Sequence, residues 1–540
     1  MIRAARIARY CEERNLATGQ GIARLAENAA WRRTAKETRR EFLAGLGKAA
    51  ALGVTATTFG PFRRALAARR PPSVDVAIVG GGIAGLACAD TLQAAGVNAT
   101  IYEGRDRLGG RIWSLGEAFP GPVTFPGQVA ERGGEFIDTT HLTIKAYARR
   151  FGLALEDVEK AWLPGDDTFF VNGERVPEVV VVDEFRDLVD AIRPDLTKLS
   201  SEVTARSFTE FDRTLDFTDL TTYLAEKDAG DIIRAIIDVA YTTEYGCEIS
   251  QLSTLAFLFF IHIDKRAKFA PFGVFSDERF HVIDGNQQIP QSIAEELAGP
   301  IELEALLLAA RKLSDGRIEL TFEQGGSSFT ALHDAVVFAL PFSTLRDVEL
   351  DASLDLPSEK RFAIDNFTMG TNAKLNVGFT GRFWAGLDTN AETWSDLPNH
   401  QLSWEVNPSR ATDQHAVIVD YSGGIRGAKL NPKRVQRETL LWLTDLDKAL
   451  PGALAAATRT DDSKFLAQLQ HWPSDPLTKG SYTCNQPGYF TTILGNEATP
   501  VGNIFFAGEH TDSFYEWQGF MEGAANSGIR AADEVLAVFA

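Results

Sequence analysis

Three glycines carry the clearest chemical signal in this sequence. Gly80, Gly82 and Gly85 follow the apolar, β-branched run 74–79 with the spacing G-x-G-x-x-G, which is typical of turns that bind the pyrophosphate of a dinucleotide. Gly80 allows the tight turn, Gly82 lets the backbone approach the pyrophosphate, and Gly85 lets the following helix pack closely on the sheet. The spacing predicts a dinucleotide site, and a glycine turn that serves packing alone is the alternative.

The elements that must position these glycines can also be read from the sequence. The run 74–79 predicts a buried parallel strand, 83–95 a helix and 99–102 a second strand. The N-terminus of that helix favours the negative charge of a phosphate. Glu103 ends the second strand about twenty residues beyond the glycines, where a carboxylate accepts a hydrogen bond from a ribose hydroxyl and disfavours the extra phosphate of NADP.

A second glycine pair follows in the segment RLGGRIWS, residues 107–114. It resembles the R-x-G-G-R-x-x-[ST] element of the flavin amine oxidase family, which includes monoamine, polyamine and L-amino-acid oxidases. The stretch 503–536 resembles the C-terminal FAD segment of that family, and 131–135 resembles its loop over the flavin. The resemblance implies FAD, held by Gly80, Gly82, Ile83, Ala84, Gly85, Glu103, Gly104, Arg105, Gly109, Gly110, Arg111, Gly133, Gly134, Glu135, Gly508, Glu509, Phe520 and Met521.

The same resemblance implies three catalytic residues, Lys374, Tyr482 and Phe520. Lys374 matches the family lysine that holds a water against flavin N5, where a cation also favours the reduction of oxygen. A solvated lysine at a sheet edge is the alternative. Tyr482 and Phe520 match two aromatic faces that steer an amine nitrogen toward the flavin, although both rings also suit core packing. The expected substrate pocket comprises Trp113, Glu135 and Trp517.

The mode of flavin attachment depends on the residue before Tyr482. Monoamine oxidases have a cysteine there that is bonded to the flavin, whereas this chain has Ser481. We do not expect Cys484 to substitute for that cysteine. The resemblance therefore implies non-covalent FAD.

The implied activity is oxidative deamination of a primary amine or L-amino acid, with oxygen as acceptor and imine or carbonyl, ammonia and hydrogen peroxide as products. Animal L-amino-acid oxidases carry a carboxylate-binding arginine near the position of Trp113, so this tryptophan favours an amine without a carboxylate. An L-amino-acid oxidase that holds the carboxylate with Arg382, Arg410 or Arg426 stays open. A flavin desaturase or protoporphyrinogen-oxidase-like enzyme is a further alternative, and a non-catalytic FAD-bound protein is disfavoured.

The composition of the chain excludes several other classes of protein. The chain has 540 residues, 44% of them hydrophobic and 24% charged, which suits a globular protein with two or more domains. Its formal net charge of -19 argues against nucleic-acid binding. The four cysteines and eight histidines show no metal-ligand spacing, so no metal is expected. No apolar run is long enough to predict a membrane span.

These observations predict an α/β fold, in which a Rossmann-type FAD-binding domain is interleaved with an α+β substrate domain built on a mixed sheet flanked by helices. The FAD-binding domain is expected from 73–140, 278–348 and 480–540, and the substrate domain from 141–277 and 349–479. Expected partners are a small amine or amino acid and oxygen, and the chain is compatible with a homodimer.

The first 72 residues form a basic extension in which TRREFL, residues 38–43, resembles a twin-arginine export signal. The expected location is periplasmic or secreted if the signal functions, and cytoplasmic if it does not. A basic amphipathic helix that serves packing is the alternative for this extension.

Overall fold

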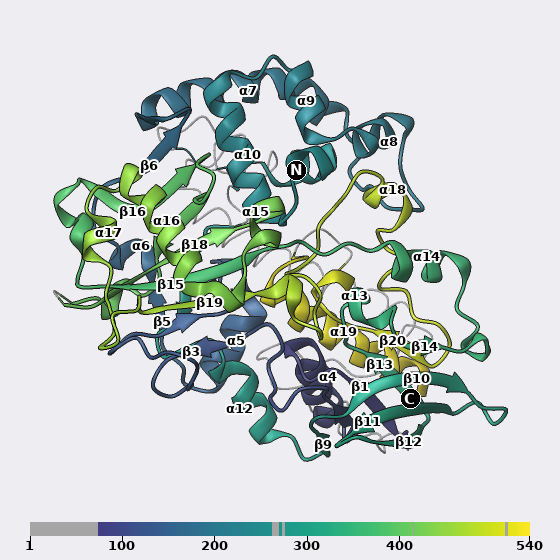
Figure 1. Cartoon of the computed structure of the whole chain (residues 1–540). Helices are drawn as coiled ribbons and strands as arrows, with labels where there is room; N and C mark the ends of the chain where they lie inside the picture. Colours follow the sequence, from purple (N-terminus) through teal and green to yellow (C-terminus); the bar gives the residue numbers. More distant parts are fainter. Residues whose placement is uncertain are drawn as a thin grey trace, which may run out of the picture.

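The computed structural model describes residues 74–261, 269, 271–272, 276–412, 414–512 and 517–539. The expected export signal and the rest of the basic extension, together with Cys11, lie outside these residues. The described chain forms two main sheets, with helices covering their faces (Figure 1).

The first sheet is parallel throughout and has the strand order β20-β13-β1-β2-β9. Parallel strands buried on both faces read as continuous apolar runs, and Val76–Val79 of β1 is buried along its whole length. The strand bounds are β1 Val76–Val79, β2 Thr100–Tyr102, β9 Ile301–Glu302, β13 Ala335–Phe338 and β20 Ile504–Phe506. All five strands lie within the three segments expected to form the FAD-binding domain.

One face of this sheet packs against the helix that follows the glycine motif and the helix that ends the chain. Val76 and Ile78 of β1 join a core with α4 (Ile83–Ala94) and α19 (Met521–Phe539). These two helices pack side by side along much of their length (Figure 1). The first and last described segments of the chain therefore share one core.

The other face is covered by a small sheet of order β12-β11-β10-β14. Tyr102 of β2 stacks on Phe322 of this sheet with ring centroids 4.3 Å apart. Strands β10, β11 and β12 of this sheet pair antiparallel in sequence order. The bounds are β10 Leu306–Lys312, β11 Ile318–Gln324, β12 Ser327–His333 and β14 Glu349–Leu350.

The second main sheet has seven strands in the order β19-β15-β18-β17-β16-β6-β7. Its pairs are antiparallel except for β16 and β6, so the sheet is mixed as expected. Along β18, Ile418 faces the core of α16 (Val435–Ala449), while Val419 faces that of α7 (Glu178–Lys198) and α10 (Asp231–Tyr245). The strand bounds are β6 Asp166–Val171, β7 Glu174–Val176, β15 Ala373–Phe379, β16 Thr389–Ser395, β17 Leu402–Glu405, β18 Ala416–Ser422 and β19 Ala467–His471.

A group of helices lies on the side of the second sheet shown uppermost in Figure 1. The region 178–226 forms three helices, α7, α8 and α9. Turns separate them, and Thr209 caps α8 through a capping box with Asp212. Besides α7 and α10, the group contains α8 Glu210–Phe217, α9 Leu220–Glu226 and α11 Thr254–Phe260.

The segment just after residue 140 contacts elements that pack on the first sheet. Helix α5 (Leu142–Arg150) packs on α19, and the backbone N–H of Thr143 donates to Glu522 at 2.8 Å. Strand β5 (Leu155–Asp157) pairs with β8 (Phe280–Val282), which begins the returning segment. The remaining named elements are β3 Ser114–Leu115, β4 Ala130–Glu131, α6 Val158–Ala161, α12 Gln288–Glu296, α13 Phe342–Leu345, α14 Ser358–Asn366, α15 Gly424–Lys429, α17 Ala453–Ala456 and α18 Tyr489–Thr492.

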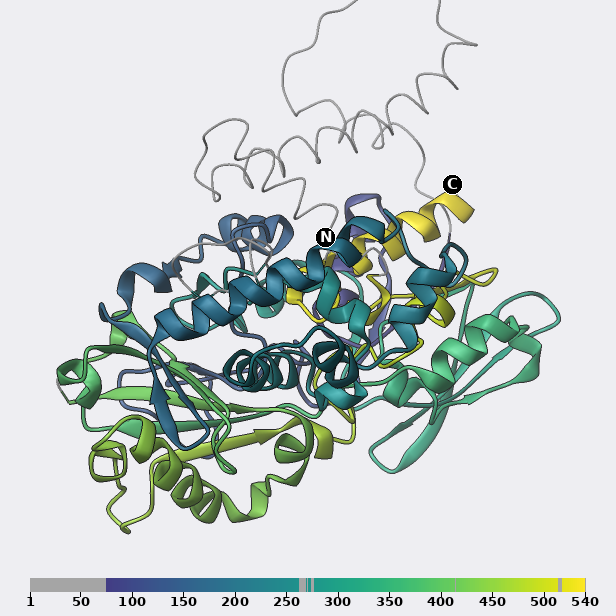
Figure 2. The ribbon, with the colours of Figure 1, turned by 90° about the horizontal axis from the view of Figure 1, so that it is seen from above.

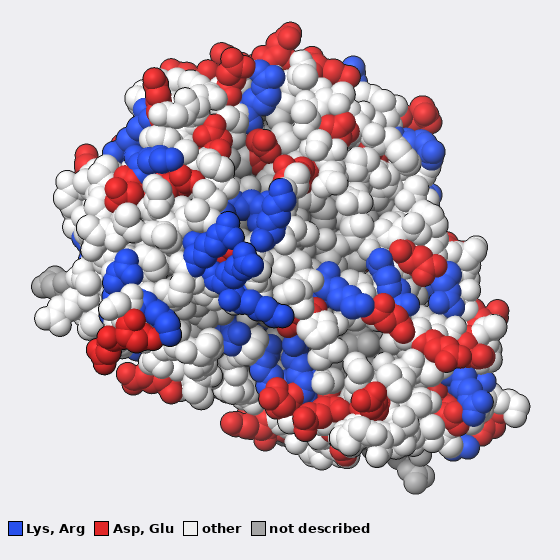
Figure 3. Space-filling view, in the orientation of Figure 1, with Lys and Arg blue, Asp and Glu red and all other residues white. Residues whose placement is uncertain are grey.

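Figure 2, the view from above, shows the C-terminal end of α19, drawn in yellow, at the outer edge of the molecule. Figure 3 shows basic residues gathered near the middle of one face, around α15, with acidic residues nearer its edges. Among the described residues, no helix is long and apolar enough to cross a membrane and no metal-binding cluster occurs. The described cysteines, Cys88, Cys247 and Cys484, are buried and free, and they pack as small apolar side chains.

Candidate active site

The three motif glycines differ in what surrounds them. Gly80 has φ +111°, and a Cβ atom there would lie 2.7 Å from the carbonyl oxygen of Ala339. A Cβ on Gly85 would lie 2.0 Å from the carbonyl oxygen of Gly80, because α4 packs tightly against the turn. A Cβ on Gly82 would meet only the Cα of Gly110, at 3.9 Å. The turn is therefore closed around Gly80 and Gly85 and open beside Gly82, where a pyrophosphate fits.

The glycine turn and the N-terminus of α4 form a recess that we call the cradle. The second glycine pair completes its open side. The N–H of Gly109 donates to the carbonyl of Gly81 at 2.9 Å, and Gly109 and Gly110 both have positive φ. No side chain caps the N-terminus of α4 in the described structure. Its first N–H groups are thus left for a ligand, and a helix N-terminus favours an anion.

Glu103 lies at the end of β2 beside the glycine turn. Its carboxylate accepts backbone N–H bonds from Gly81 at 2.7 Å and Arg105 at 2.8 Å. Burial raises the pKa of Glu103, although both N–H groups oppose the shift. The guanidinium of Arg105 donates two hydrogen bonds to Asp475 and none to Glu103. Glu103 is therefore fixed where a ribose hydroxyl can reach its remaining lone pairs.

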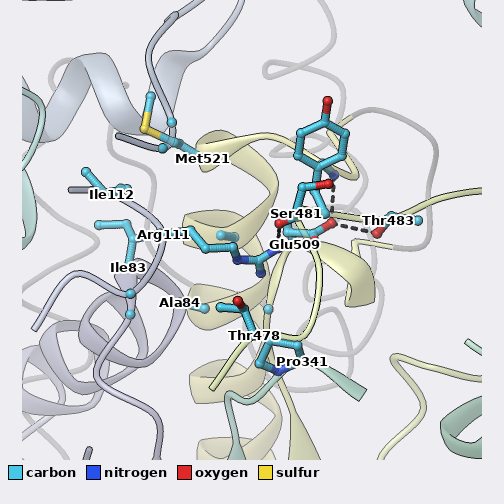
Figure 4. A pocket seen from close by; sticks show the side chains of 18 of the residues that line it. Ile83, Ala84, Arg111, Ile112, Pro341, Thr478, Ser481, Thr483, Glu509 and Met521 are labelled. Carbon is cyan, nitrogen blue, oxygen red and sulfur yellow. Dashed lines mark hydrogen bonds and ion pairs between the residues drawn. The ribbon is translucent and has the colours of Figure 1, made fainter. Parts of the chain in front are cut away.

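The C-terminal segment forms the opposite wall through Glu509 (Figure 4). Glu509 accepts from Arg111 at 2.9 Å, from the hydroxyl of Thr483 at 2.6 Å and from the N–H of Gly519 at 2.8 Å. Although burial opposes it, the Arg111 charge helps to lower the pKa of Glu509. Arg111 also donates to the carbonyl of Ser481 at 2.6 Å. Segments distant in sequence thus meet at one buried carboxylate.

A single cavity extends from this cradle toward the seven-stranded sheet. The open space beside Gly82, the uncapped α4 and the glycine-lined walls fit the dinucleotide of FAD. Nearly all expected cofactor and catalytic residues line the cavity; Gly85 is packed behind the turn instead. The lining residues among them are Gly80, Gly82, Ile83, Ala84, Glu103, Gly104, Arg105, Gly109, Gly110, Arg111, Gly133, Gly134, Glu135, Lys374, Tyr482, Gly508, Glu509, Phe520 and Met521.

The far part of the cavity is a mostly aromatic space that we call the chamber. Two of its rings are joined, because the hydroxyls of Tyr482 and Tyr421 lie 2.7 Å apart and that of Tyr482 also donates to the carbonyl of Thr243 at 3.1 Å. The Gly519 turn, which precedes Phe520, lies directly beside the Tyr482 ring. The chamber is lined by Glu135, Phe136, Asp138, Glu244, Tyr245, Phe260, Glu278, Lys374, Trp404, Tyr421, Tyr482 and Phe520.

Lys374 lies on β15 with its charged end inside the chamber rather than at a solvated edge, and it is only 4% exposed. Its Nζ forms an ion pair with Glu135 and donates to the carbonyl of Gly133 at 3.1 Å. The other oxygen of Glu135 accepts from Nε1 of Trp404 at 2.9 Å. Sequence reasoning assigned Lys374 and Glu135 to the site separately and did not foresee that they form a pair.

Glu244 and Glu278 are chamber residues that the sequence reasoning missed. Burial raises their pKa values, to about 8 for Glu244 and about 7 for Glu278. Glu244 lies in the last turn of α10 and Glu278 in the loop before β8. No local motif marks either position, and only the fold brings both carboxyl groups to one cavity.

Two expected pocket residues lie elsewhere. Trp113 is sandwiched between the guanidinium groups of Arg107 and Arg132, 3.8 and 3.2 Å from its ring centroid, in a separate depression. Trp517 packs edge-on against His141, behind Phe520, and is not a cavity-lining residue. Neither residue lines the chamber: Trp113 lines the separate depression, and Trp517 packs against His141 and Phe520.

The arginines considered for carboxylate binding are also engaged outside the chamber. Arg382 pairs with Glu405 at 2.6 Å, Arg426 pairs with Asp420 at 2.5 Å, and Arg410 pairs with Asp284. None of the three lines the cavity.

A parallel nucleotide-binding sheet, joined by one cavity to an aromatic chamber, defines an FAD-dependent oxidoreductase. The chain belongs to the family of flavin containing amine oxidoreductases, whose sequence model matches residues 83–536. This assignment confirms the resemblance noted in the sequence and the expected α/β fold. It also makes the protein an enzyme that acts on amines.

Known proteins with similar sequences span nearly the whole described chain. The pig flavin-containing amine oxidase B is 23% identical and covers 86% of each chain. A pseudooxynicotine dehydrogenase of a Pseudomonas species is 24% identical and covers 92% of this chain and 95% of its own. A putative L-amino-acid oxidase of Bacillus subtilis is 25% identical, with coverages of 88% and 96%.

Solved structures confirm the fold. A putrescine oxidase bound to putrescine superimposes with a TM-score of 0.71 at 20% identity, and cyclohexylamine oxidase from Brevibacterium oxydans gives 0.71 at 22%. Both alignments cover 86% of this chain and 99% of the other.

Proposed function

We propose that the enzyme oxidatively deaminates a primary amine to an imine, which hydrolyses to a carbonyl compound and ammonia, with oxygen as the acceptor and hydrogen peroxide as the second product. The observation that carries this proposal is the continuous cavity that joins the nucleotide cradle to a chamber containing Lys374 and Tyr482. FAD, when bound, supplies the acceptor for the hydride that leaves the amine carbon and passes the electrons on to oxygen.

The protein contributes orientation and electrostatics to this reaction. The faces of Tyr482 and Phe520 place the amine nitrogen, and the bond between the hydroxyls of Tyr482 and Tyr421 fixes the first ring. Lys374, held by Glu135 and Gly133, keeps a cation beside the site where oxygen gains negative charge. The aromatic walls exclude water from the reacting groups.

The charges of the chamber favour an amine over an amino acid. Among the described residues that line it, the basic side chain is Lys374, and that charge is already paired with Glu135. The carboxylate of an amino acid would instead meet the carboxyl groups of Glu244 and Glu278. A carboxylate there would lose its water without gaining a positive partner, which disfavours binding.

The residues around Ser481 support non-covalent attachment of FAD. Its hydroxyl donates to Oδ1 of Asn372 at 2.6 Å, and a serine oxygen is a poor substitute for a thiolate. Cys484 is buried, and it is not among the cavity-lining residues.

The test is anaerobic mixing of the purified flavoprotein with a panel of amines and L-amino acids, followed by admission of air. We expect amines to bleach the flavin absorbance, and peroxide to form in air with recovery of the absorbance. A flavin that no amine reduces would contradict the proposal, and reduction by amino acids in preference to amines would reassign it.

A further inference from the structure

The turn that carries Phe520 is held by buried polar groups outside the chamber. Gly519 has φ +88°, and its N–H donates to Glu509 at 2.8 Å. The N–H of Phe520 donates to the carbonyl of Trp517 at 3.1 Å, so residues 517–520 form a tight turn directly before α19. The place of the Phe520 ring in the chamber therefore depends on what fixes this turn.

Gln518 supplies a second attachment of the turn. Its Nε2 donates to the hydroxyl of Tyr489 at 2.7 Å and to the carbonyl of His510 at 3.0 Å. The same nitrogen lies 3.2 Å from Oε1 of Glu497, and the hydroxyl of Tyr489 donates to that oxygen at 2.7 Å. Adjacent residues of the turn are thus bonded toward two different buried carboxyl groups.

Glu497 lies where a carboxyl group is costly to place. It is fully buried, and its Oε2 receives no hydrogen bond within the described structure. Burial raises the pKa of Glu497 to about 7, and the positive charge of Lys360 opposes the shift. Nζ of Lys360, on α14, donates to the carbonyl oxygen of Glu497 at 2.7 Å. Neither residue lines the cavity.

A neutral side chain would hold the turn with less burial of charge. An amide at position 497 could accept the same hydrogen bonds at Oε1, whereas a buried carboxylate costs free energy. A hydrogen bond to an ionised acceptor is about twice as strong as one between neutral groups. The carboxylate of Glu497 is therefore suited to fixing its donors firmly.

We propose that Glu497 and Gln518 are positioning residues, which hold the ring of Phe520 against the substrate nitrogen and thereby raise kcat/KM for the amine. The inference rests on the proposed function, which assigns that ring to the nitrogen. Glu497 fixes the amide of Gln518 directly and through Tyr489, and the turn passes this position on to Phe520. Small displacements of a group that orients the substrate lower the rate strongly.

The first experiment measures oxidation of benzylamine and pentylamine at pH 8, above the pKa of Glu497. Gln518→Met and Glu497→Met remove the hydrogen bonds and keep the length of the side chains. Each is expected to lower kcat/KM by about tenfold or more. The larger part should lie in kcat, because a misoriented amine binds without reacting. Glu497→Gln keeps an oxygen acceptor and should lose clearly less; a loss equal to that of Glu497→Met would overturn the inference.

The double variant Glu497→Met with Gln518→Met tests whether the two residues act together. Effects that pass through one shared contact are not additive, so the double variant should be no slower than the slower single variant. Losses that multiply would show independent roles and overturn the inference. Unchanged kcat/KM in Gln518→Met would do the same.

Hydrogen–deuterium exchange of the full-length, oxidised flavoprotein reports on the turn without any turnover. Peptides that cover residues 517–524 should exchange clearly faster in both methionine variants than in the wild type. Unchanged exchange in Gln518→Met would overturn the inference. If the wild-type enzyme oxidises no amine of the panel, the proposed function fails, and the exchange measurement still decides whether Glu497 and Gln518 hold the turn.

Asp212→Asn is the matched control for general destabilisation. Asp212 is also a fully buried acid, and it accepts hydrogen bonds from Ser200 and Thr209 at the start of α8. This variant should unfold at a lower temperature and keep both kcat/KM and the exchange of 517–524; a comparable loss of kcat/KM would overturn the inference. Should the methionine variants fold poorly, Gln518→Asn, one methylene shorter, carries the same expectations.

Discussion

Lys374 and Glu135 form an ion pair across the chamber wall, between strand β15 and the loop that follows β4. Each is almost fully buried, and Trp404 and the carbonyl of Gly133 complete their hydrogen bonds. The pair ties the substrate sheet to the loop beside the nucleotide cradle. Replacing one member of the pair therefore leaves the other without its partner.

Lys374→Met is expected to slow the flavin steps by about 100-fold, because it removes the cation from the chamber. It leaves Glu135 buried and unpaired, which we expect to destabilise the fold by about 3–5 kcal/mol. The measurements are stopped-flow reduction and reoxidation, with urea unfolding. The double variant Lys374→Met with Glu135→Gln should regain stability without regaining rate; recovery of both would contradict a role for the lysine charge.

Gly82→Ala is expected to weaken FAD binding by at least about tenfold, because the new methyl group enters the open side of the cradle. The apoprotein should fold normally, since Gly82 has an ordinary φ of −74°. Flavin titration of the apoprotein measures the affinity.

Gly85→Ala provides the matched contrast. Its Cβ would collide with backbone at 2.0 Å, so we expect a loss of about 3 kcal/mol or more in stability whether or not FAD is present. Equal behaviour of the two alanine variants would refute the separate roles of the glycines.

Tyr482→Leu is expected to lower kcat/KM for amines by about tenfold because it removes an aromatic face. Tyr482→Phe retains that face and loses only the hydroxyl contacts with Tyr421 and Thr243. Its effect should be clearly smaller. Steady-state kinetics of both variants with one amine test this order, and a larger loss in the phenylalanine variant would assign the role to the hydroxyl.

The stability of the amine-free enzyme should fall as pH rises. Burial raises the pKa of Glu244 from 4.5 to about 8, so the folded state binds a proton more tightly than the unfolded state. The stabilisation is complete below about pH 4.5 and is lost as pH rises through about 8. Glu278, which faces Glu135, Lys374 and Asp277, contributes in the same direction.

Thermal unfolding between about pH 5 and 9 measures this slope. Glu244→Gln should flatten it, and Glu226→Gln should not. An unchanged slope in the chamber variant would show that Glu244 does not titrate over this range.

The sequence was informative where chemistry depends on local spacing. The strand before the glycine turn, the helix after it and the next strand are in the structure as expected, because each is set by a continuous pattern of residue types. Trp113 is the counterexample. Its position after the glycine pair is local, but the two arginines that enclose it include Arg132, whose proximity depends on the fold.

The acids of the chamber could not be read from the sequence for the same reason. Glu244 ends an amphipathic helix and Glu278 lies in a charged loop, and both look like solvated residues in isolation. They become half-buried only when α10 and the loop before β8 fold around the cavity. Partners such as Trp404 for Glu135 are likewise set by packing between distant strands.

The cradle begins at Gly82 and is completed by Glu509 and Met521, more than four hundred residues later. A nascent polypeptide therefore cannot assemble the cofactor site until the segment that starts α19 has left the ribosome. Bound flavin therefore indicates that the chain has been synthesised and folded as far as α19. A polypeptide truncated before this helix lacks part of the FAD site.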